Sequence, residues 1–217
     1  MIQNELLVCR ELWLSVSGVE FRDVVRKRRM VHVFESRPVE PDVVDRLLDV
    51  ARRGPSAGFS QGTDFLVLDD PATLARFWEL TEDPRFPYEP GELEAAPPVL
   101  VVALADPGRY IERYSRPDKI AFGLDRADAW PVKFWDTDTA MACMLLLLAA
   151  VDAGLGGWYF GIPYGEAEFR REFEIPDDRN VIGVVGLGHA GVEERPRGSV
   201  YSLARRPLHE MVHRNGW

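Results

Sequence analysis

Residues 137–153 read TDTAMACMLLLLAAVDA, and this segment contains the longest apolar run of the chain, the twelve residues Ala140–Val151. A bilayer core needs about twenty apolar residues in a row, so the run predicts a helix buried inside a protein rather than a membrane span. It is apolar around its whole circumference, which is typical of a helix that packs on more than one side. Gly154 is the expected stop of this helix, and residues 158–160, Trp-Tyr-Phe, predict a strand after it.

Outward from this helix, the apolar pattern predicts further helices and strands in mixed order. The expected helices begin near Phe21, Asp42, Pro71 and Glu166, and the expected strands are residues 65–68, 99–104 and 181–187. Residues 106–136 read as an irregular excursion that carries aromatic surface. Because no repeat or linker divides the chain, we predict one α+β domain over residues 19–217, preceded by a loosely attached extension at residues 1–18.

Composition bounds the class of protein and its surroundings. The chain has 217 residues, of which 46% are apolar and 28% charged, values typical of a globular domain. The net charge of −9 argues against nucleic acid as a partner, although the positive charges gathered at residues 22–29 suggest a small anionic ligand held at one point. Cys9 and Cys143 do not indicate a disulfide, and no signal peptide is recognisable, so we predict a cytoplasmic protein that contacts no membrane.

Two short motifs suggest other chemistry, and their context disfavours both. Residues 209–213 read HEMVH and match the H-E-x-x-H pattern of zinc enzymes, but only four residues follow them and no third ligand is in place. Residues 186–191 read GLGHAG and match a dinucleotide-binding G-x-G-x-x-G, but the broken sequence after them predicts no helix to hold a pyrophosphate. We therefore predict no metal site and expect these glycines to let a strand end close to neighbouring backbone.

Two pairs of arginines, near the two ends of the domain, share one chemistry. Arg28 and Arg29 lie near the start, and Arg205 and Arg206 lie near the end. A planar guanidinium binds phosphate oxygens through two parallel hydrogen bonds and keeps its charge at physiological pH, so the pairs suit a terminal phosphate. Between them, residues 54–61 read GPSAGFSQ, a loop of small residues in which backbone and hydroxyl groups are able to approach a flat ligand.

At these residues the sequence resembles the nitroreductase family of flavoproteins, from about Val19 to Trp217. The Pro-Ser-Ala-Gly-Phe form of the loop is most similar to the branch near the flavin-destroying enzymes that make dimethylbenzimidazole, and to unassigned nitroreductase-like proteins. The pieces that match in order and spacing are Arg28 to His32 with Phe34, Pro38-Val39, Ala51 to Gln61, Asp152 to Gly156, Phe160 to Pro163, Ile175-Pro176, Arg206 to Leu208 and Val212-His213.

The resemblance implies a three-layer α/β/α sandwich with a central mixed sheet, an intimate homodimer, and FMN bound at the subunit interface. The arginines would hold the FMN phosphate, and the loop of small residues would line the isoalloxazine ring from the partner subunit. The implied cofactor-binding residues are Arg28, Arg29, Arg205 and Arg206 at the phosphate, Pro55, Ser56 and Ala57 at the ring, the backbone N–H groups around Phe160 and Gly161 at flavin N5, and Met30, His32 and Gln61 beside them.

The implied reaction is transfer of a hydride from NAD(P)H through flavin N5 to a small, flat acceptor of nitroaromatic or quinone type, by a ping-pong mechanism. No side chain is expected to act as a catalytic group. His32 either tunes the flavin electrostatically, as an imidazolium that stabilises the anionic reduced form, or simply caps the preceding helix. Trp130 and Phe134 either line the substrate pocket or belong to the core or the dimer contact.

Met30 and Phe59 stand where polar residues are common in the family, and they leave two alternatives open. One is a flavin- or nucleotide-binding protein without turnover. The other is a relative that uses the deazaflavin F420 or that fragments its flavin. If Met30 occupies the position of the aspartate that the flavin-destroying enzymes use, fragmentation is disfavoured.

Overall fold

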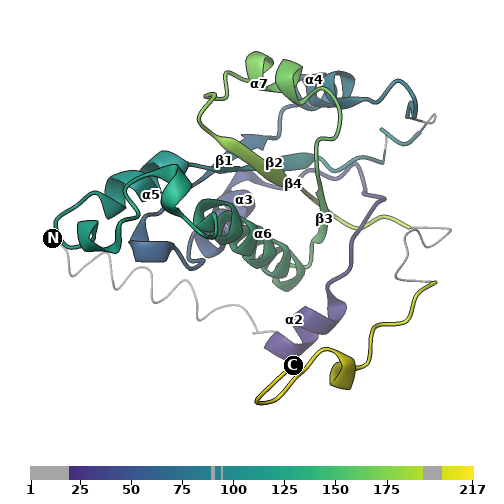
Figure 1. Ribbon diagram of the computed structural model, residues 1–217. Coiled ribbons are helices and arrows are strands. Elements are labelled where there is room, and N and C mark those ends of the chain that lie inside the picture. The colour runs from purple at the N-terminus through teal and green to yellow at the C-terminus, as the bar shows by residue number, and fades with distance from the viewer. Residues whose placement is uncertain (1–19, 89–90, 94, 193–201) are drawn as a thin grey trace, which may run out of the picture.

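The computed structural model of the protein describes residues 20–88, 91–93, 95–192 and 202–217. The predicted extension at residues 1–18, and Cys9 within it, lie outside the described residues. The remainder folds around one sheet, with helices on both of its faces (Figure 1).

Four strands form the central sheet in the order β1-β2-β4-β3. All three pairings are antiparallel, whereas a mixed sheet was expected; the parallel contact described is an isolated bridge between Met30 and Gly157. β1 and β2 are joined by residues 69–98 at one end of the sheet, where Leu68 pairs with Leu100, and β3 and β4 are joined by residues 161–179 at the other end. The connection from β2 to β3, residues 106–155, instead carries the chain across to the opposite end of the sheet, so each neighbouring pair of strands is antiparallel. The strands are β1 (Thr63–Leu68), β2 (Val99–Ala105), β3 (Gly156–Phe160) and β4 (Asn180–Gly188).

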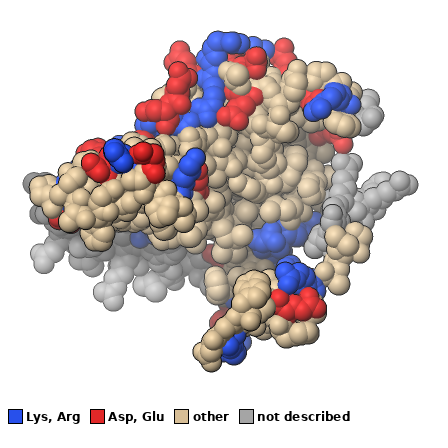
Figure 2. All heavy atoms as spheres, viewed as in Figure 1, with Lys and Arg blue, Asp and Glu red and all other residues tan. Residues whose placement is uncertain are grey.

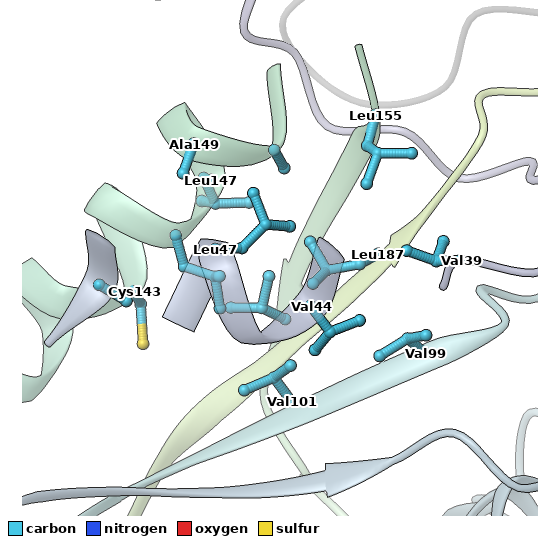
Figure 3. Packing of buried hydrophobic residues seen from close by; sticks show 14 of the residues in the cluster. Val39, Val44, Leu47, Val99, Val101, Cys143, Leu147, Ala149, Leu155 and Leu187 are labelled. Carbon is cyan, nitrogen blue, oxygen red and sulfur yellow. The ribbon is translucent and has the colours of Figure 1, made fainter. Parts of the chain in front are cut away.

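Helices cover both faces of the sheet, and each face has its own core. On one face, α3 (Pro41–Ala51) and α6 (Phe134–Asp152) pack against the odd-numbered residues of β2 (Figure 3). On the other, α4 (Pro71–Thr81) and α7 (Glu166–Glu172) pack against the even-numbered residues, as Figure 1 also shows. Since both faces of β2 are covered, all seven of its residues are buried. The predicted α/β/α sandwich is confirmed.

Helix α6 begins three residues before the predicted start and is the longest helix described. It is long and apolar enough to cross a membrane by length and composition alone, a test that core helices of soluble proteins also pass. One side of α6 is buried against α3 and the sheet, including Cys143 and Leu146. The other side leaves Met141 and Met144 47% and 46% exposed. The helix is thus a core helix with an uncovered apolar stripe.

The predicted irregular excursion contains a regular helix, α5 (Pro107–Tyr114), followed by single 3₁₀ turns at Ile120–Phe122 and Ala127–Ala129. Asp106 caps α5 by accepting a hydrogen bond from the N–H of Arg109 at 3.2 Å. Tyr110 and Tyr114, four residues apart, are both buried and anchor the excursion to the domain. A further 3₁₀ turn is Ala57–Phe59, and a short helix, α2 (Phe21–Lys27), leads into the arginines.

The glycines of the G-x-G-x-x-G motif have packing roles. A Cβ added at Gly186 would lie 2.6 Å from Pro97, and one at Gly188 would lie 2.6 Å from Pro98 and 2.9 Å from Phe34. The strand therefore ends against neighbouring chain, which confirms the expected role of these glycines.

The H-E-x-x-H segment does not form the α-helix that would place its two histidines on one face. Its first residues belong to a 3₁₀ turn, Leu208–Glu210, and the ring of His213 stacks on Trp217 with 4.2 Å between centroids. Within the described ranges, no three His, Cys, Asp or Glu side chains gather in a way that would hold a metal ion.

Candidate functional site

The first predicted group of residues follows α2 and runs along the edge of β3. Arg28 is half-buried, and its Nη1 atom is buried without a hydrogen-bond partner in the described part of the chain. An unpaired buried guanidinium nitrogen is costly unless an acceptor arrives to complete it. Three residues on, the N–H of Val31 donates to the carbonyl of Gly157 at 3.1 Å and fixes the segment to β3.

Met30 and His32 both contact β3 directly. The N–H of Tyr159 donates to the Sδ atom of Met30 at 3.4 Å, so the methionine side chain is tied to the strand. His32 meets Trp158 edge to face, with 5.4 Å between ring centroids. Trp158 in turn stacks on Trp78 of α4. The sulfur of Met30 therefore accepts the hydrogen bond of a backbone N–H at the edge of the sheet.

The end of β3 presents open backbone. The side chain of Phe160 turns toward α4 and stacks on Trp78, with 5.7 Å between centroids. Gly161 is exposed, and no heavy atom lies within 4 Å of the position that its Cβ would take. The main chain at Gly161 is thus exposed.

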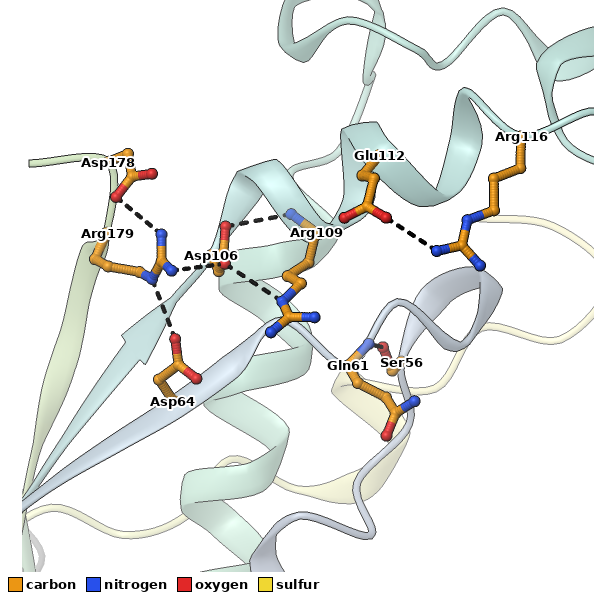
Figure 4. Close-up of polar contacts among 9 residues, drawn as sticks. All are labelled: Ser56, Gln61, Asp64, Asp106, Arg109, Glu112, Arg116, Asp178 and Arg179. Atoms are coloured by element: carbon orange, nitrogen blue, oxygen red, sulfur yellow. Dashed lines mark hydrogen bonds and ion pairs between the residues drawn. The ribbon is translucent and has the colours of Figure 1, made fainter. Parts of the chain in front are cut away.

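The second predicted group is the loop of residues 55–61, whose conformation is strained. The N–H of Gln61 donates to the Oγ atom of Ser56 at 2.8 Å (Figure 4), and the N–H of Phe59 donates to the carbonyl of Ser56 at 2.8 Å. Phe59 and Gln61 have positive φ values of 56° and 55°, which side-chain-bearing residues adopt rarely. Phe59 is also 75% exposed. Such strain persists only where surrounding contacts enforce it.

Three side chains outside the loop hold it in place, and sequence reasoning did not identify them. Asp138 of α6, only 5% exposed, accepts hydrogen bonds at its Oδ2 atom from the N–H of Ala57 and from the hydroxyl of Tyr110, both at 2.8 Å. Burial raises the pKa of Tyr110, so its hydroxyl keeps the proton that it donates. Arg113 donates from Nε to the carbonyl of Gly58 at 2.9 Å. A carboxylate two residues before the longest apolar run of the chain was the available signal for Asp138.

An ion-pair network lies beside the loop, at the ends of β1, β2 and β4 (Figure 4). Arg179 contacts the carboxylates of Asp64, Asp106 and Asp178 at 3.1, 2.9 and 2.8 Å. Asp106 is also the cap of α5, so this network fixes the start of the helix that carries Tyr110 and Arg113.

The two aromatic residues predicted at the substrate pocket have different environments. Trp130 is buried, donates from Nε1 to the carbonyl of Leu124 at 2.8 Å, and packs on Tyr114 with 4.7 Å between centroids. Phe134 lies at the start of α6, edge-on to Trp130, and is 38% exposed. These contacts favour the core role for Trp130, while Phe134 keeps a face available to a ligand.

The C-terminal arginines lie on a segment that is exposed throughout, residues 202–217. Arg206 donates from Nη2 to the carbonyl of Glu210 at 2.8 Å, within the same segment. Arg206 is thus hydrogen-bonded within its own segment, and both C-terminal arginines are exposed to solvent. Leu208, Met211 and other apolar side chains on the segment are equally uncovered.

The two main groups of predicted residues lie at opposite edges of the sheet. The loop leads into β1, one edge strand, whereas Met30 pairs with Gly157 in β3, the other edge strand. Three interstrand spacings separate these edges by about 14 Å. Gly157 packs against Leu147, which lies about 14 Å further along α6 than Asp138, the residue that holds the loop.

The loop leads into Thr63, which pairs with Ala105 at one end of β2, whereas Gly157 pairs with Leu187, the partner of Val99 at the other end of β2. The two groups are thus separated by about 20 Å along the strands as well as by the width of the sheet.

A separate cavity of about 570 Å³ lies between the start of α3 and α4, and includes none of the predicted site residues. Its wall is rich in proline and contains Trp78, the residue on which Phe160 stacks. The predicted site residues instead lie along open surface.

The chain is an α+β sandwich, and the two groups of predicted residues lie at opposite edges of its sheet. A sequence model described as the nitroreductase family matches residues 25–189. The chain therefore belongs to the nitroreductase family, and as a member it is an oxidoreductase.

Individual relatives agree with this assignment. Proteins of Methanothermobacter thermautotrophicus and Archaeoglobus fulgidus, each named "Putative NADH dehydrogenase/NAD(P)H nitroreductase", are 27% and 24% identical to the chain. The first match covers 81% of this chain and 80% of the relative, and the second covers 89% and 97%.

Solved structures show the same fold. A nitroreductase family protein of Clostridium difficile superposes with a TM-score of 0.68 at 20% identity, covering 92% of this chain and 100% of its own. The nitroreductase family protein of Streptococcus pneumoniae gives a TM-score of 0.67 at 18% identity, covering 90% and 100%.

Proposed function

We propose that the protein is an FMN-dependent oxidoreductase that transfers a hydride from NAD(P)H to a small, flat acceptor by a ping-pong mechanism. The observation that carries the proposal is the buried Nη1 atom of Arg28, which has no acceptor among the described residues and lies at the β3 edge that ends in the open backbone of Gly161. An anionic group on Arg28 and a flat ring at Gly161 would both lie along this edge. FMN has both parts.

When bound, FMN would supply the redox chemistry, taking a hydride at N5 from NAD(P)H and passing it to the acceptor in the same slot. The chain would bind and orient the cofactor and shield it from water. Arg28 and Arg29, joined by Arg205 and Arg206, would neutralise the phosphate. Pro55, Ser56 and Ala57 would line the ring, with Met30, Gln61 and the Phe160–Gly161 backbone beside it.

The proposal includes a homodimer, because the two groups of predicted residues in one chain, the half-sites of the proposed site, are separated by about 20 Å along the strands and by the width of the sheet. Two copies are able to bring the loop of one chain to the Arg28 edge of the other. The uncovered stripe on α6 with Met141 and Met144 suits such a contact, and Figure 2 shows the region around α6 largely free of charged side chains. An exposed apolar stripe on a core helix is typical of a subunit interface.

The test of cofactor binding is a comparison of two arginine variants. We expect the purified protein to be yellow, with an absorbance band at about 450 nm that disappears when NAD(P)H is added. Arg28→Ala should weaken FMN binding at least about tenfold, because it removes a charged hydrogen-bond donor. Arg26→Ala is the matched control, since Arg26 is exposed and paired with Asp23 at 2.9 Å. A colourless protein that takes up no added FMN would defeat the proposal.

The same preparation separates the alternatives. A yellow protein whose colour NAD(P)H does not bleach would be a flavin-binding protein without turnover, and uptake of F420 instead of FMN would identify the deazaflavin relative. If position 30 is the one at which the flavin-destroying enzymes carry an aspartate, fragmentation of the flavin is disfavoured, because Met30 offers a thioether bound to the N–H of Tyr159 instead of a carboxylate.

His32 stays a candidate tuner of the flavin. If its imidazolium stabilises the anionic reduced flavin, His32→Gln should lower the midpoint potential of bound FMN at pH 5 more than at pH 8. If His32→Gln has the same midpoint potential as the wild-type chain at both pH values, the role of His32 is its edge-to-face contact with Trp158.

A further inference from the structure

We infer that Asp138 is a positioning residue that fixes the main chain of the loop at residues 56–61 in the conformation that lines the flavin ring. This inference rests on the proposed function, because the loop is assigned to the ring there. Asp138 lies behind the loop in α6 and is buried, so it acts through Ala57 rather than by touching the cofactor.

Asp138 accepts two hydrogen bonds through one oxygen atom. Its Oδ2 atom accepts from the N–H of Ala57 and from the hydroxyl of Tyr110, both at 2.8 Å. A carboxylate oxygen is a stronger acceptor than a neutral oxygen, so this side chain is a strong anchor for one particular N–H.

The loop needs such an anchor because its own hydrogen bonds leave it strained. Gly58, Phe59 and Gln61 all have φ between 55° and 63°, and two of them carry side chains. Positive φ is unfavourable for the two residues that carry side chains, so a freed loop would relax toward other conformations. Asp138 accepts a hydrogen bond from the N–H of Ala57 at the start of the strained stretch, and Arg113 donates one to the carbonyl of Gly58. Arg113 belongs to α5, and Asp138 accepts a hydrogen bond from Tyr110 of the same helix, so both anchors link the loop to α5.

The experiment compares matched variants of two aspartates in the same turn of α6. Asp138→Leu removes the acceptor, and Asp138→Asn leaves a weaker neutral oxygen in its place. Asp136→Leu and Asp136→Asn are the controls, because Asp136 accepts from Asn180 at 2.8 Å and does not hold the loop. Three quantities are measured: amide hydrogen exchange at Ala57 in the flavin-free full chain, the dissociation constant of added FMN, and the visible circular dichroism of bound FMN.

We expect Asp138→Leu to speed exchange at Ala57 and to raise the FMN dissociation constant about five- to tenfold, with a changed flavin dichroism. Asp138→Asn should show the same changes at smaller size, and the Asp136 variants neither. If Asp138→Leu does not fold, unchanged exchange in Asp138→Asn overturns the inference. Faster exchange with unaltered FMN affinity and dichroism also overturns it, since Asp138 would then stabilise the loop without positioning it for the ring.

The two proposals fail in different ways. If the wild-type chain binds no FMN, the proposed function fails and the positioning role for the ring fails with it, although exchange at Ala57 still shows whether Asp138 holds the loop. If the wild-type chain binds FMN and the Asp138 variants bind it equally well, the proposed function stands and only the inference about Asp138 is wrong.

Discussion

The thiol of Cys143 lies in the core between α3 and α6 with 2% of its surface exposed, and burial raises its pKa to about 11. The folded state therefore holds the thiol proton more tightly than the unfolded chain, in which a thiol titrates near its usual pKa of 9.0. This contribution to stability is complete below about pH 9 and is lost as the pH rises toward about 11.

We predict that the free energy of unfolding falls by roughly 2 kcal/mol more between pH 9 and 11 in the wild-type chain than in Cys143→Ala. Urea unfolding at a series of pH values measures the difference. Background titration of tyrosine and lysine is common to both proteins and cancels in the comparison. Parallel pH profiles of the two proteins would show that ionisation of Cys143 is not coupled to folding.

At the scale of elements, the end of β4 is packed so closely that glycine is required. A methyl group at Gly188 would lie 2.6 Å from Pro98 and 2.9 Å from Phe34, whereas one at Gly161 would meet no heavy atom within 4 Å. We expect Gly188→Ala to lower the free energy of unfolding by about 1 to 3 kcal/mol, as overpacking does, and Gly161→Ala to leave it nearly unchanged. Thermal unfolding of the flavin-free proteins is the measurement. Equal stability of the two variants would contradict this packing.

Sequence pattern was sufficient for β2 and α6, because each contains an uninterrupted apolar run, of strand length in β2 and of helix length in α6. It missed α5, since Pro107-Gly108 is typical of a turn and the stability of this helix comes from the Asp106 cap and two buried tyrosines. Arg28 was predicted from its charge and from the family resemblance. Asp138 was not, because its role depends on a contact with Ala57, 81 residues away in the sequence.

At the scale of the whole molecule, we predict that two chains associate through the exposed apolar stripe of α6 that contains Met141 and Met144. Met144→Lys would place a charge in the proposed contact, where it would lose its hydration. We expect this variant to be monomeric in sedimentation velocity at concentrations where the wild-type chain is dimeric. Phe86→Lys is the control, because Phe86 is 75% exposed and belongs to no core cluster described here. A dimeric Met144→Lys would place the interface elsewhere.

A dimer with shared sites makes a stricter prediction about mixing. Arg28→Ala disables one half-site and Pro55→Trp, at an exposed loop position, blocks the other. If each complete site takes Arg28 from one chain and the loop from its partner, a heterodimer of the two variants has one intact site and one doubly defective site. Random reassociation of an equal mixture makes half of the dimers mixed, so about one quarter of the wild-type FMN binding and NAD(P)H oxidation should return. Sites contained within single chains would recover nothing on mixing, because every chain in the mixture would keep its own defect.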